Sequence, residues 1–207
     1  MIIAVDGPVA AGKGTLARRI AEKYGFHYLD TGALYRAVGL LMLKEGQDLS
    51  DVEAAANMAA RVGEVSPEDP GLREESTGGA ASIVANNSEV RAALLQYQRN
   101  FAHRKPGTVL DGRDIGTVVC PEAEVKLFIT ATAEIRARRR FDELIAKGNS
   151  VSYHDILADL KIRDARDQGR TTAPLKKAID AHLLDTSKLD IEAALNAASV
   201  LIDNRLG

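Results

Sequence analysis

The chain has 207 residues, of which 45% are hydrophobic and 27% charged, a balance typical of a globular protein and not of a disordered one. Its net charge of −2 argues against a general nucleic-acid binder, which usually needs a basic domain. The single cysteine, Cys120, excludes an internal disulfide framework and suits a reducing compartment. No apolar run approaches the ~20 residues that cross a bilayer, and residues 1–6 lack the basic start of a secretory signal. We therefore expect a cytoplasmic protein with no membrane or nucleic-acid partner.

Apolar, β-branched stretches alternate with segments of helical periodicity, which is the pattern of a parallel α/β sheet. Strands are expected at residues 2–5, 27–29, 108–110, 126–129 and 182–184. Helices are expected from the Gly-rich turn to residue 24 and at residues 33–44, 51–61, 80–86, 89–104, 134–147, 153–166 and 191–204. Residues 63–79 are rich in proline, glycine and acids and are expected to form a mobile connection. The pattern predicts one sheet core with two excursions, at about residues 50–100 and 140–175.

A phosphate-binding loop follows the first expected strand and leads into the first helix. It consists of Gly7, Pro8, Val9, Ala10, Ala11, Gly12, Lys13, Gly14 and Thr15. Gly7, Gly12 and Lys13 meet the spacing G-x-x-x-x-G-K, in which backbone N–H groups form an anion nest at a helix N-terminus. Lys13 can then bridge the terminal phosphates of a nucleotide. This strand–loop–helix context makes a chance glycine turn a poor explanation, and we expect ATP to bind here.

The residue after Lys13 departs from the strict motif, which places Ser or Thr there to bind Mg²⁺. Gly14 intervenes and Thr15 follows, which argues against a direct bond between a hydroxyl and the metal. This ending resembles that of adenylate kinase and its relatives, where Mg²⁺ is held mainly by phosphates and water. A guanine-specific switch should carry Asn-Lys-x-Asp, and the nearest approach, residues 187–190, lacks the amide side chain. A nucleotide-binding switch is therefore a weak alternative to a kinase.

Arginines are distributed as phosphoryl transfer to an anionic acceptor requires. Such transfer depends on neutralising charge and aligning donor with acceptor more than on a strong base. Arg36 and Arg113 follow the second and third expected strands, and Arg163 and Arg170 lie in the second excursion. The carboxyl ends of strands near a phosphate-binding loop are where open α/β sheets bind ligands. For any single arginine, a solvated helix face is the simpler explanation, but together they predict an anion site.

Three further blocks carry a family resemblance: residues 30–36 (DTGALYR), 111–119 (DGRDIGTVV) and 163–170 (RDARDQGR). In this order behind the loop, they resemble bacterial-type cytidylate kinases over nearly the whole chain. The resemblance implies an α/β, adenylate-kinase-like fold of three layers (α/β/α) with a five-stranded parallel sheet, and an enzyme that phosphorylates CMP or dCMP with ATP and Mg²⁺. It implies a monomeric single domain, residues 1–207, with its core at about 1–50, 105–135 and 176–207. A monophosphate-binding insertion would span about residues 51–104 and an arginine-rich lid about 136–175.

The resemblance also implies roles for individual residues. Lys13, Arg113, Arg163 and Arg170 would act in catalysis, and Arg139 and Arg140 would join the loop in binding ATP. Arg36, Arg113 and Arg170 would hold the phosphate of CMP, Arg163 and Asp167 its ribose, and Ser82, Arg91 and Asp114 its base. No side chain would bind Mg²⁺ directly.

Simpler interpretations remain open for some of these residues. Asp114 could pair with Arg113 or cap a turn, Arg91 could be a surface residue, and Arg139 and Arg140 could lie on a solvated helix face. Residues 63–79 are also too short for the small antiparallel sheet that fuller members of the family carry in the insertion. A kinase for UMP, AMP or another small metabolite therefore remains an alternative.

Overall fold

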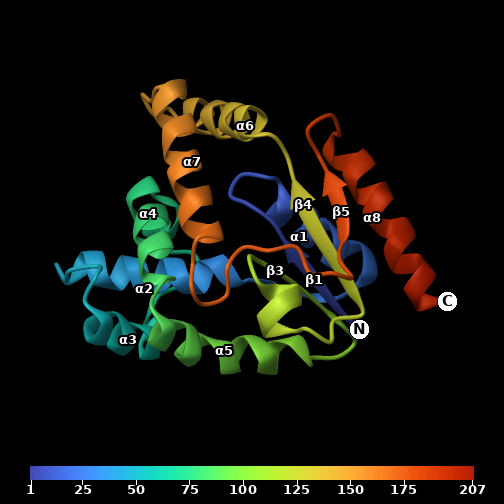
Figure 1. Cartoon of the computed structure of the whole chain (residues 1–207), viewed down its shortest axis with the longest axis horizontal. Helices are drawn as coiled ribbons and strands as arrows, with labels where there is room; N and C mark the ends of the chain where they lie inside the picture. The colour runs from blue at the N-terminus through green and yellow to red at the C-terminus, as the bar shows by residue number, and fades with distance from the viewer.

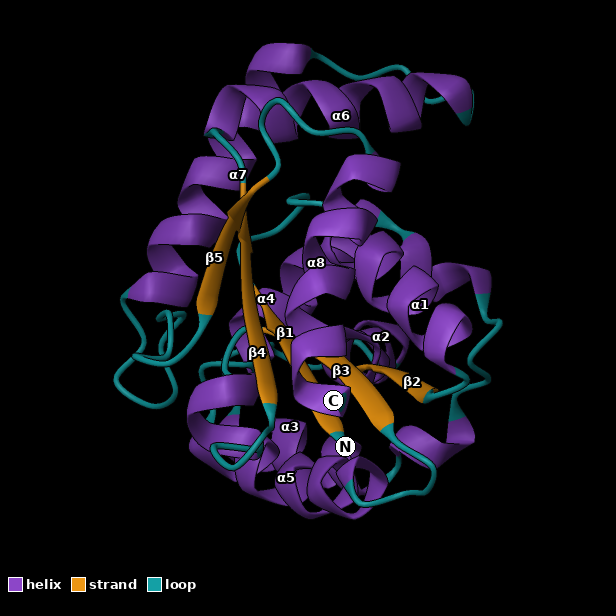
Figure 2. Ribbon diagram, turned by 90° about the vertical axis from the view of Figure 1, so that its right-hand side faces the viewer, coloured by secondary structure: helices purple, strands orange, loops and turns teal.

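A computed structural model describes all 207 residues, and a five-stranded sheet forms its centre. The strands are β1 (Ile2–Asp6), β2 (His27–Asp30), β3 (Thr108–Gly112), β4 (Val125–Thr130) and β5 (His182–Asp185). Their order is β2-β3-β1-β4-β5, and every neighbouring pair is parallel. Figure 2 shows the strands between layers of helices. The predicted α/β class with five parallel strands is confirmed.

Helices follow or cover each strand (Figure 1). They are α1 (Lys13–Tyr24), α2 (Thr31–Lys44), α3 (Val52–Ala60), α4 (Glu75–Val84), α5 (Ser88–Ala102), α6 (Ala133–Ala146), α7 (Tyr153–Gln168) and α8 (Ile191–Leu206). Three short turns complete the order: the 3-10 turns η1 (Val62–Glu64) and η2 (Pro70–Arg73), and the π-helical turn η3 (Ile115–Val119).

The side chains of β1 explain why both faces of the sheet are covered. Ile3 and Val5 pack in one core with residues of α1 and α8, whereas Ile2 and Ala4 pack in another with residues of α5 and η3. Successive side chains of a strand point to opposite faces. A central parallel strand is therefore apolar over most of its length, as residues 2–5 of β1 are before Asp6 ends the strand.

The two predicted excursions pack beside this core as helical units. Helices α2, α3, α4 and α5 share an apolar cluster, and no strand lies within residues 51–104. Helices α6 and α7 lie together at the top of Figure 1 over a smaller cluster. That cluster also contacts Val9 and Ala10 of the phosphate-binding loop. The second excursion thus lies against the loop that the sequence assigns to ATP.

Two local predictions are wrong. Helix α4 begins at Glu75 and not at residue 80, so the end of the expected mobile connection is helical. A Cβ on Gly39 of α2 would lie 2.9 Å from the backbone nitrogen of Ala81. This close packing outweighs the low helix propensity of Gly78 and Gly79. The short turns η1, η2 and η3 were not predicted, whereas the ends of the other strands and helices lie close to expectation.

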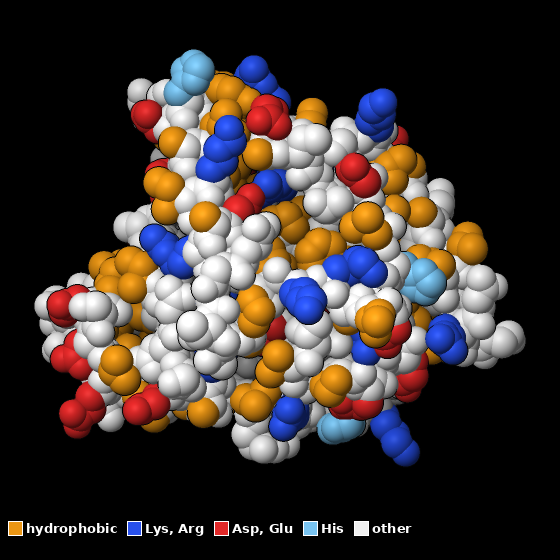
Figure 3. All heavy atoms as spheres, viewed as in Figure 1, with side chains coloured by type: hydrophobic (Ala, Val, Ile, Leu, Met, Phe, Trp, Pro, Cys, Tyr) orange, Lys and Arg blue, Asp and Glu red, His pale blue; other side chains and the backbone are white.

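The surface carries mixed charge on the face shown in Figure 3. There, basic side chains in blue and acidic side chains in red are interspersed, without a continuous basic surface. No helix of the structure combines the length and apolar character that crossing a membrane requires.

Candidate active site

A cavity of about 250 Å³ opens at the carboxyl ends of β2 and β3, between α2, α4 and α7. This is the edge at which parallel α/β sheets bind ligands. Predicted residues that line it are Val9, Lys13, Gly14, Arg36, Ser82, Arg91, Arg113, Asp114, Arg163, Asp167 and Arg170. The structure therefore brings together the proposed acceptor site and the lysine of the phosphate-binding loop, from five separate parts of the chain.

The phosphate-binding loop owes its shape to glycines at its two ends. Gly7 has φ 152°, and a Cβ there would lie 2.0 Å from the carbonyl oxygen of Ile129 on β4, so only glycine fits. Gly12 has φ 84° and occupies the N-cap of α1 without a side-chain cap. The first N–H groups of α1 therefore have no side-chain acceptor, which leaves them to an anion.

Lys13 begins α1 and is enclosed by charged groups. Its Nζ lies 3.5 Å from the carbonyl oxygen of Pro8, its only hydrogen-bond partner. Burial, reinforced by the nearby Arg113, lowers the pKa of the ammonium to about 8. Asp111 and Asp30 oppose this shift, and the pKa of Asp111 is itself raised by burial and by Asp30. A bound phosphate would give the Lys13 ammonium group a hydrogen-bonded anionic partner.

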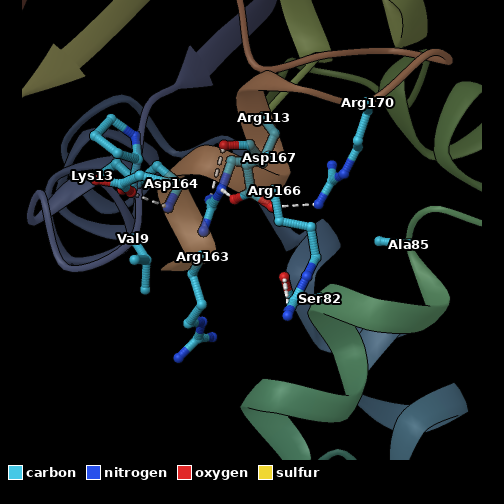
Figure 4. Close-up of polar contacts among 12 residues, drawn as sticks. Val9, Lys13, Ser82, Ala85, Arg113, Arg163, Asp164, Arg166, Asp167 and Arg170 are labelled. Atoms are coloured by element: carbon cyan, nitrogen blue, oxygen red, sulfur yellow. Dashed lines mark hydrogen bonds and ion pairs between the residues drawn. The ribbon is translucent and has the colours of Figure 1, made fainter. Parts of the chain in front are cut away.

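Arg113, Asp167 and Arg170 form a buried ion cluster between the core and α7 (Figure 4). Arg113 Nε donates to Asp167 Oδ2 at 2.8 Å, and the other oxygen of Asp167 accepts from Arg170. Burial alone would raise the pKa of Asp167, but the two guanidinium groups hold it below its usual value. Nε of Arg170 is buried without any partner. An unpaired buried donor costs stability, so this atom is suited to bind an anion.

Arg91 and Asp114 face each other in the same cavity as a buried pair. Arg91 also donates to the carbonyl oxygen of Ala85 at 3.3 Å, and its guanidinium lies 5.4 Å from the centre of the Tyr35 ring. Two simpler interpretations are therefore wrong. Arg91 is not a surface residue, and Asp114 pairs neither with Arg113 nor caps the turn that follows it.

The other residues predicted to bind CMP each form a hydrogen bond with a neighbouring residue. Arg36 donates to Asp30 at 2.6 Å at the start of α2. Ser82 Oγ accepts from Arg166 of α7 at 3.0 Å, a contact drawn in Figure 4. Arg163 donates to Glu75 at 2.9 Å and to the carbonyl oxygen of Gly78 at 3.1 Å. Helix α7 thus contacts α4 directly over the cavity.

The two arginines assigned to ATP differ in position. Arg139 donates to the backbone oxygen of Thr186 at 2.6 Å, and its Nη1 would lie 3.9 Å from a Cβ on Gly12. Arg139 therefore lies beside the phosphate-binding loop. Arg140 instead donates to Glu75 at 2.6 Å and to Glu143 at 2.9 Å. Its nearest partners belong to helices and not to the loop.

Sequence reasoning missed several polar residues of the cavity. Asp30 is the last residue of β2 and Asp111 the last but one of β3, and both line the cavity. Their position at strand ends was a usable signal, because carboxyl ends of parallel strands meet at one edge of the sheet. No group of three His, Cys, Asp or Glu side chains is arranged to hold a metal ion.

Comparison with known proteins decides the family. The sequence matches the family model described as cytidylate kinase over residues 3–204. The chain belongs to the cytidylate kinase family. It is 56% identical to the cytidylate kinase of Rhizobium meliloti, over 99% of this chain and 97% of that one. The cytidylate kinase of Brucella suis is 54% identical over 99% and 94%.

Solved structures of low sequence identity share the fold of this member of the cytidylate kinase family. The uncharacterized protein from Eubacterium ventriosum is 14% identical and superposes with a TM-score of 0.55, covering 100% of this chain and 99% of that chain. This likeness supports the three-layer architecture alone.

Proposed function

We propose that this protein transfers the γ-phosphoryl group of ATP to CMP or dCMP, giving ADP and the corresponding diphosphate. One observation carries the proposal together with the family: the buried pair Arg91–Asp114 shares a cavity with the ion cluster around Arg113 and with Lys13. The pair offers a donor and an acceptor for a base edge. The arginines of the ion cluster offer positive charge for the phosphate of the acceptor, and Lys13 offers positive charge for the phosphates of ATP.

ATP would bind with its phosphates in the loop of residues 7–15. Free N–H groups at the start of α1 and Lys13 would hold the β- and γ-phosphates, with Arg139 beside the loop. Asp30 and Asp111 face Lys13. Two carboxylates at the phosphate end fit a hydrated Mg²⁺ held through water and phosphate oxygens, as expected from the position of Gly14. When bound, Mg²⁺ would neutralise charge on the β- and γ-phosphates.

The acceptor phosphate would lie between Arg36, Arg113 and Arg170. Nε of Arg170 has no partner and would gain one from a phosphate oxygen. An oxygen of this phosphate then forms a bond to the γ-phosphorus as the bond to the bridging oxygen of ADP breaks. Asp167 and Arg163 would contact the ribose, Asp167 by accepting from a sugar hydroxyl.

The base would be recognised by Arg91, Asp114 and Ser82. Asp114 can accept from the exocyclic amino group of cytosine, and Arg91 can donate to its ring nitrogen and carbonyl oxygen. Uracil presents a carbonyl in place of the amino group and would leave the carboxylate unpaired. Such an unpaired buried group costs about 1–3 kcal/mol, which favours CMP over UMP without excluding UMP.

We also propose how the parts of the domain act. Residues 51–104 would carry the monophosphate-binding insertion, residues 136–175 the lid, and the remainder the core. Contacts between α4 and α7 over the cavity support this division. The protein would act as a cytoplasmic monomer on nucleotides alone.

A coupled assay of ADP release tests the proposal. The purified protein is given ATP and Mg²⁺ with CMP, dCMP, UMP, AMP or shikimate as the acceptor. We expect the highest kcat/KM with CMP or dCMP. A preference for AMP, UMP or shikimate would instead support another small-metabolite kinase. Slow ATP turnover that no acceptor stimulates would support a nucleotide-binding switch.

A further inference from the structure

Asp6 ends β1 directly before the phosphate-binding loop, and its side chain is buried although no step above uses it. Its Oδ1 accepts from the backbone N–H of Ile115 and its Oδ2 from that of Gly116, each at 2.8 Å. These two residues open η3, which follows Arg113 and Asp114. Asp6 therefore connects the strand that precedes the phosphate-binding loop to the segment that carries Arg113 and Asp114, two residues assigned to CMP.

The side chain that caps η3 comes from a residue that is far from this turn in the sequence. The first N–H groups of a helical turn lack partners within the turn, and the N-cap side chain commonly accepts from them. Asp114 occupies the N-cap of η3, and aspartate is among the residues preferred there. However, Asp114 makes no capping hydrogen bond and instead pairs with Arg91 in the cavity. Asp6, distant in the sequence, does the capping.

We propose that Asp6 is a positioning residue for base recognition. By capping η3 from β1, it leaves the carboxylate of Asp114 free to face the base of the acceptor nucleotide. This inference rests on the proposed function, because the base is the ligand assigned there to Asp114 and Arg91. A π-helical turn at this point agrees with the frequent occurrence of such turns at functional sites.

The geometry requires a carboxylate at position 6 and leaves little room for a side chain at position 116. Two N–H donors converge on Asp6, one on each oxygen, whereas asparagine would turn an NH₂ group toward one of them. A Cβ on Gly116 would lie 3.4 Å from Asp6 Oδ2 and 3.1 Å from Cδ of Lys126. Burial raises the pKa of Asp6 to about 7, with a small contribution from Asp114, while the two N–H groups and Lys13 oppose the shift. The two backbone bonds thus favour the ionised form that caps η3.

Asp6→Asn is the direct test, because it keeps the shape of the side chain and replaces one hydrogen-bond-accepting oxygen with an NH₂ group. Steady-state assays with CMP and with UMP, both at saturating ATP, give kcat/KM for each acceptor. We expect kcat/KM for CMP to fall about tenfold and the CMP-to-UMP ratio to fall about fivefold, as Asp114 returns to cap η3. A folded variant whose ratio stays within about twofold of the wild type would overturn the proposal.

Asp190→Ala is the matched control. Asp190 caps α8 by accepting from the backbone N–H of Ala193 at 2.8 Å, and it does not line the cavity. Its loss removes an aspartate cap and some stability while leaving the CMP-to-UMP ratio unchanged. If Asp6→Asn does not fold, Gly116→Ala takes its place, since the added methyl group would crowd the Lys126 side chain at 3.1 Å and contact Asp6 Oδ2 at 3.4 Å. The same ratio should fall there to a smaller extent, and an unchanged ratio overturns the proposal.

The wild-type protein separates this inference from the proposed function. A wild type that shows no preference for CMP contradicts the proposed function and this inference with it. A wild-type preference for CMP that persists in Asp6→Asn contradicts only the role of Asp6.

Discussion

The phosphate-binding loop, which would hold the donor ATP, and the arginines assigned to the acceptor CMP are held in place differently at the same cavity. We call them the donor loop and the acceptor arginines. The loop is shaped by its backbone, with Gly7 and Gly12 at conformations that other residues rarely adopt, and its Lys13 has a single weak partner. The acceptor arginines are instead fixed by acids. These pairs are Arg36–Asp30, Arg91–Asp114, Arg113–Asp167, Arg163–Glu75 and Arg170–Asp167.

This difference separates two ways of preparing a site for phosphate. A backbone nest is rigid and keeps its charge unbalanced until the ligand arrives. Guanidinium groups paired with acids are held in place, but they must share or exchange partners when an anion binds. Substitutions should therefore damage the donor loop through shape and the acceptor site through charge.

Removing charge from the acceptor site should have the largest effect. Arg113→Ala should lower kcat by about 10²–10³-fold, because it removes a donor aimed at the transferred and accepting phosphates. The protein should remain folded, since Asp167 keeps Arg170 as a partner. The coupled assay measures kcat, and urea unfolding monitors the fold.

Arg61→Ala controls for the loss of a paired arginine. Arg61 bonds to Glu45 and Glu64 on the surface and does not line the cavity. It should leave kcat unchanged. Normal turnover in Arg113→Ala would remove Arg113 from the proposed site.

Changing the shape of the donor loop should come next. In Gly7→Ala the added methyl group would lie 2.0 Å from the Ile129 oxygen, so β1 and β4 must separate or the loop must move. We expect a loss of about 1–3 kcal/mol in the free energy of unfolding, with weaker ATP binding. Urea unfolding and calorimetric titration with ATP measure the two effects.

Gly25→Ala isolates the backbone contribution. Gly25 ends α1 with φ 65° and has no atom within 4 Å of a built Cβ. This variant should lose about 1 kcal/mol through its left-handed conformation alone and bind ATP normally. Equal losses in both variants would show that the contact with Ile129 is unimportant.

Much of the donor loop could be predicted from the sequence because its conformation requires glycine at fixed spacing. The fold class followed from the alternation of apolar, β-branched stretches with segments of helical periodicity, because the central strands of a parallel sheet are covered on both faces. The acceptor arginines were found from their place after strands and from the family resemblance. These features all have a local signature in the chain.

What could not be predicted depends on contacts between distant residues. Nothing near Asp114 in the sequence shows that Asp6 caps the following turn. The start of α4 was missed because Gly78 and Gly79 weaken a helix locally, while its packing on α2 stabilises it. Contacts of Arg166 with Ser82 and of Arg163 with Glu75 likewise follow from the position of α7 over α4.

The lowered pKa of Lys13 predicts an alkaline limit on ATP capture. With a pKa of about 8 in the free enzyme, the ammonium loses its proton as the pH rises through that value. We expect kcat/KM for ATP to be roughly tenfold lower at pH 9 than at pH 7. kcat should change less, because bound phosphates stabilise the ammonium and raise its pKa.

Lys13→Arg distinguishes this group from others that titrate near pH 8. Arginine stays charged throughout the range, so the alkaline decline should disappear from the profile of the variant, even where its absolute activity is low. An identical decline in both proteins would assign it to another group.

The smallest expected effect concerns the ion pairs that join α4 to α6 and α7 beside the proposed CMP site. Glu75 at the start of α4 accepts from Arg140 of α6 and from Arg163 of α7, at 2.6 and 2.9 Å. Its carboxylate is half exposed, so each pair contributes about 0.2–1 kcal/mol. Glu75→Gln should therefore raise KM for CMP about threefold and leave KM for ATP nearly unchanged.

Glu143→Gln is the informative control, because Glu143 also pairs with Arg140 but lies on the same helix. This variant removes the ion pairs of Glu143 with Arg140 and Lys147 without separating α6 and α7 from α4, so KM for CMP should stay constant. If Glu75→Gln instead lowers KM for CMP, Glu75 competes with the nucleotide for Arg163. The acceptor arginines would then be restrained by their acids in the free enzyme and not aligned by them.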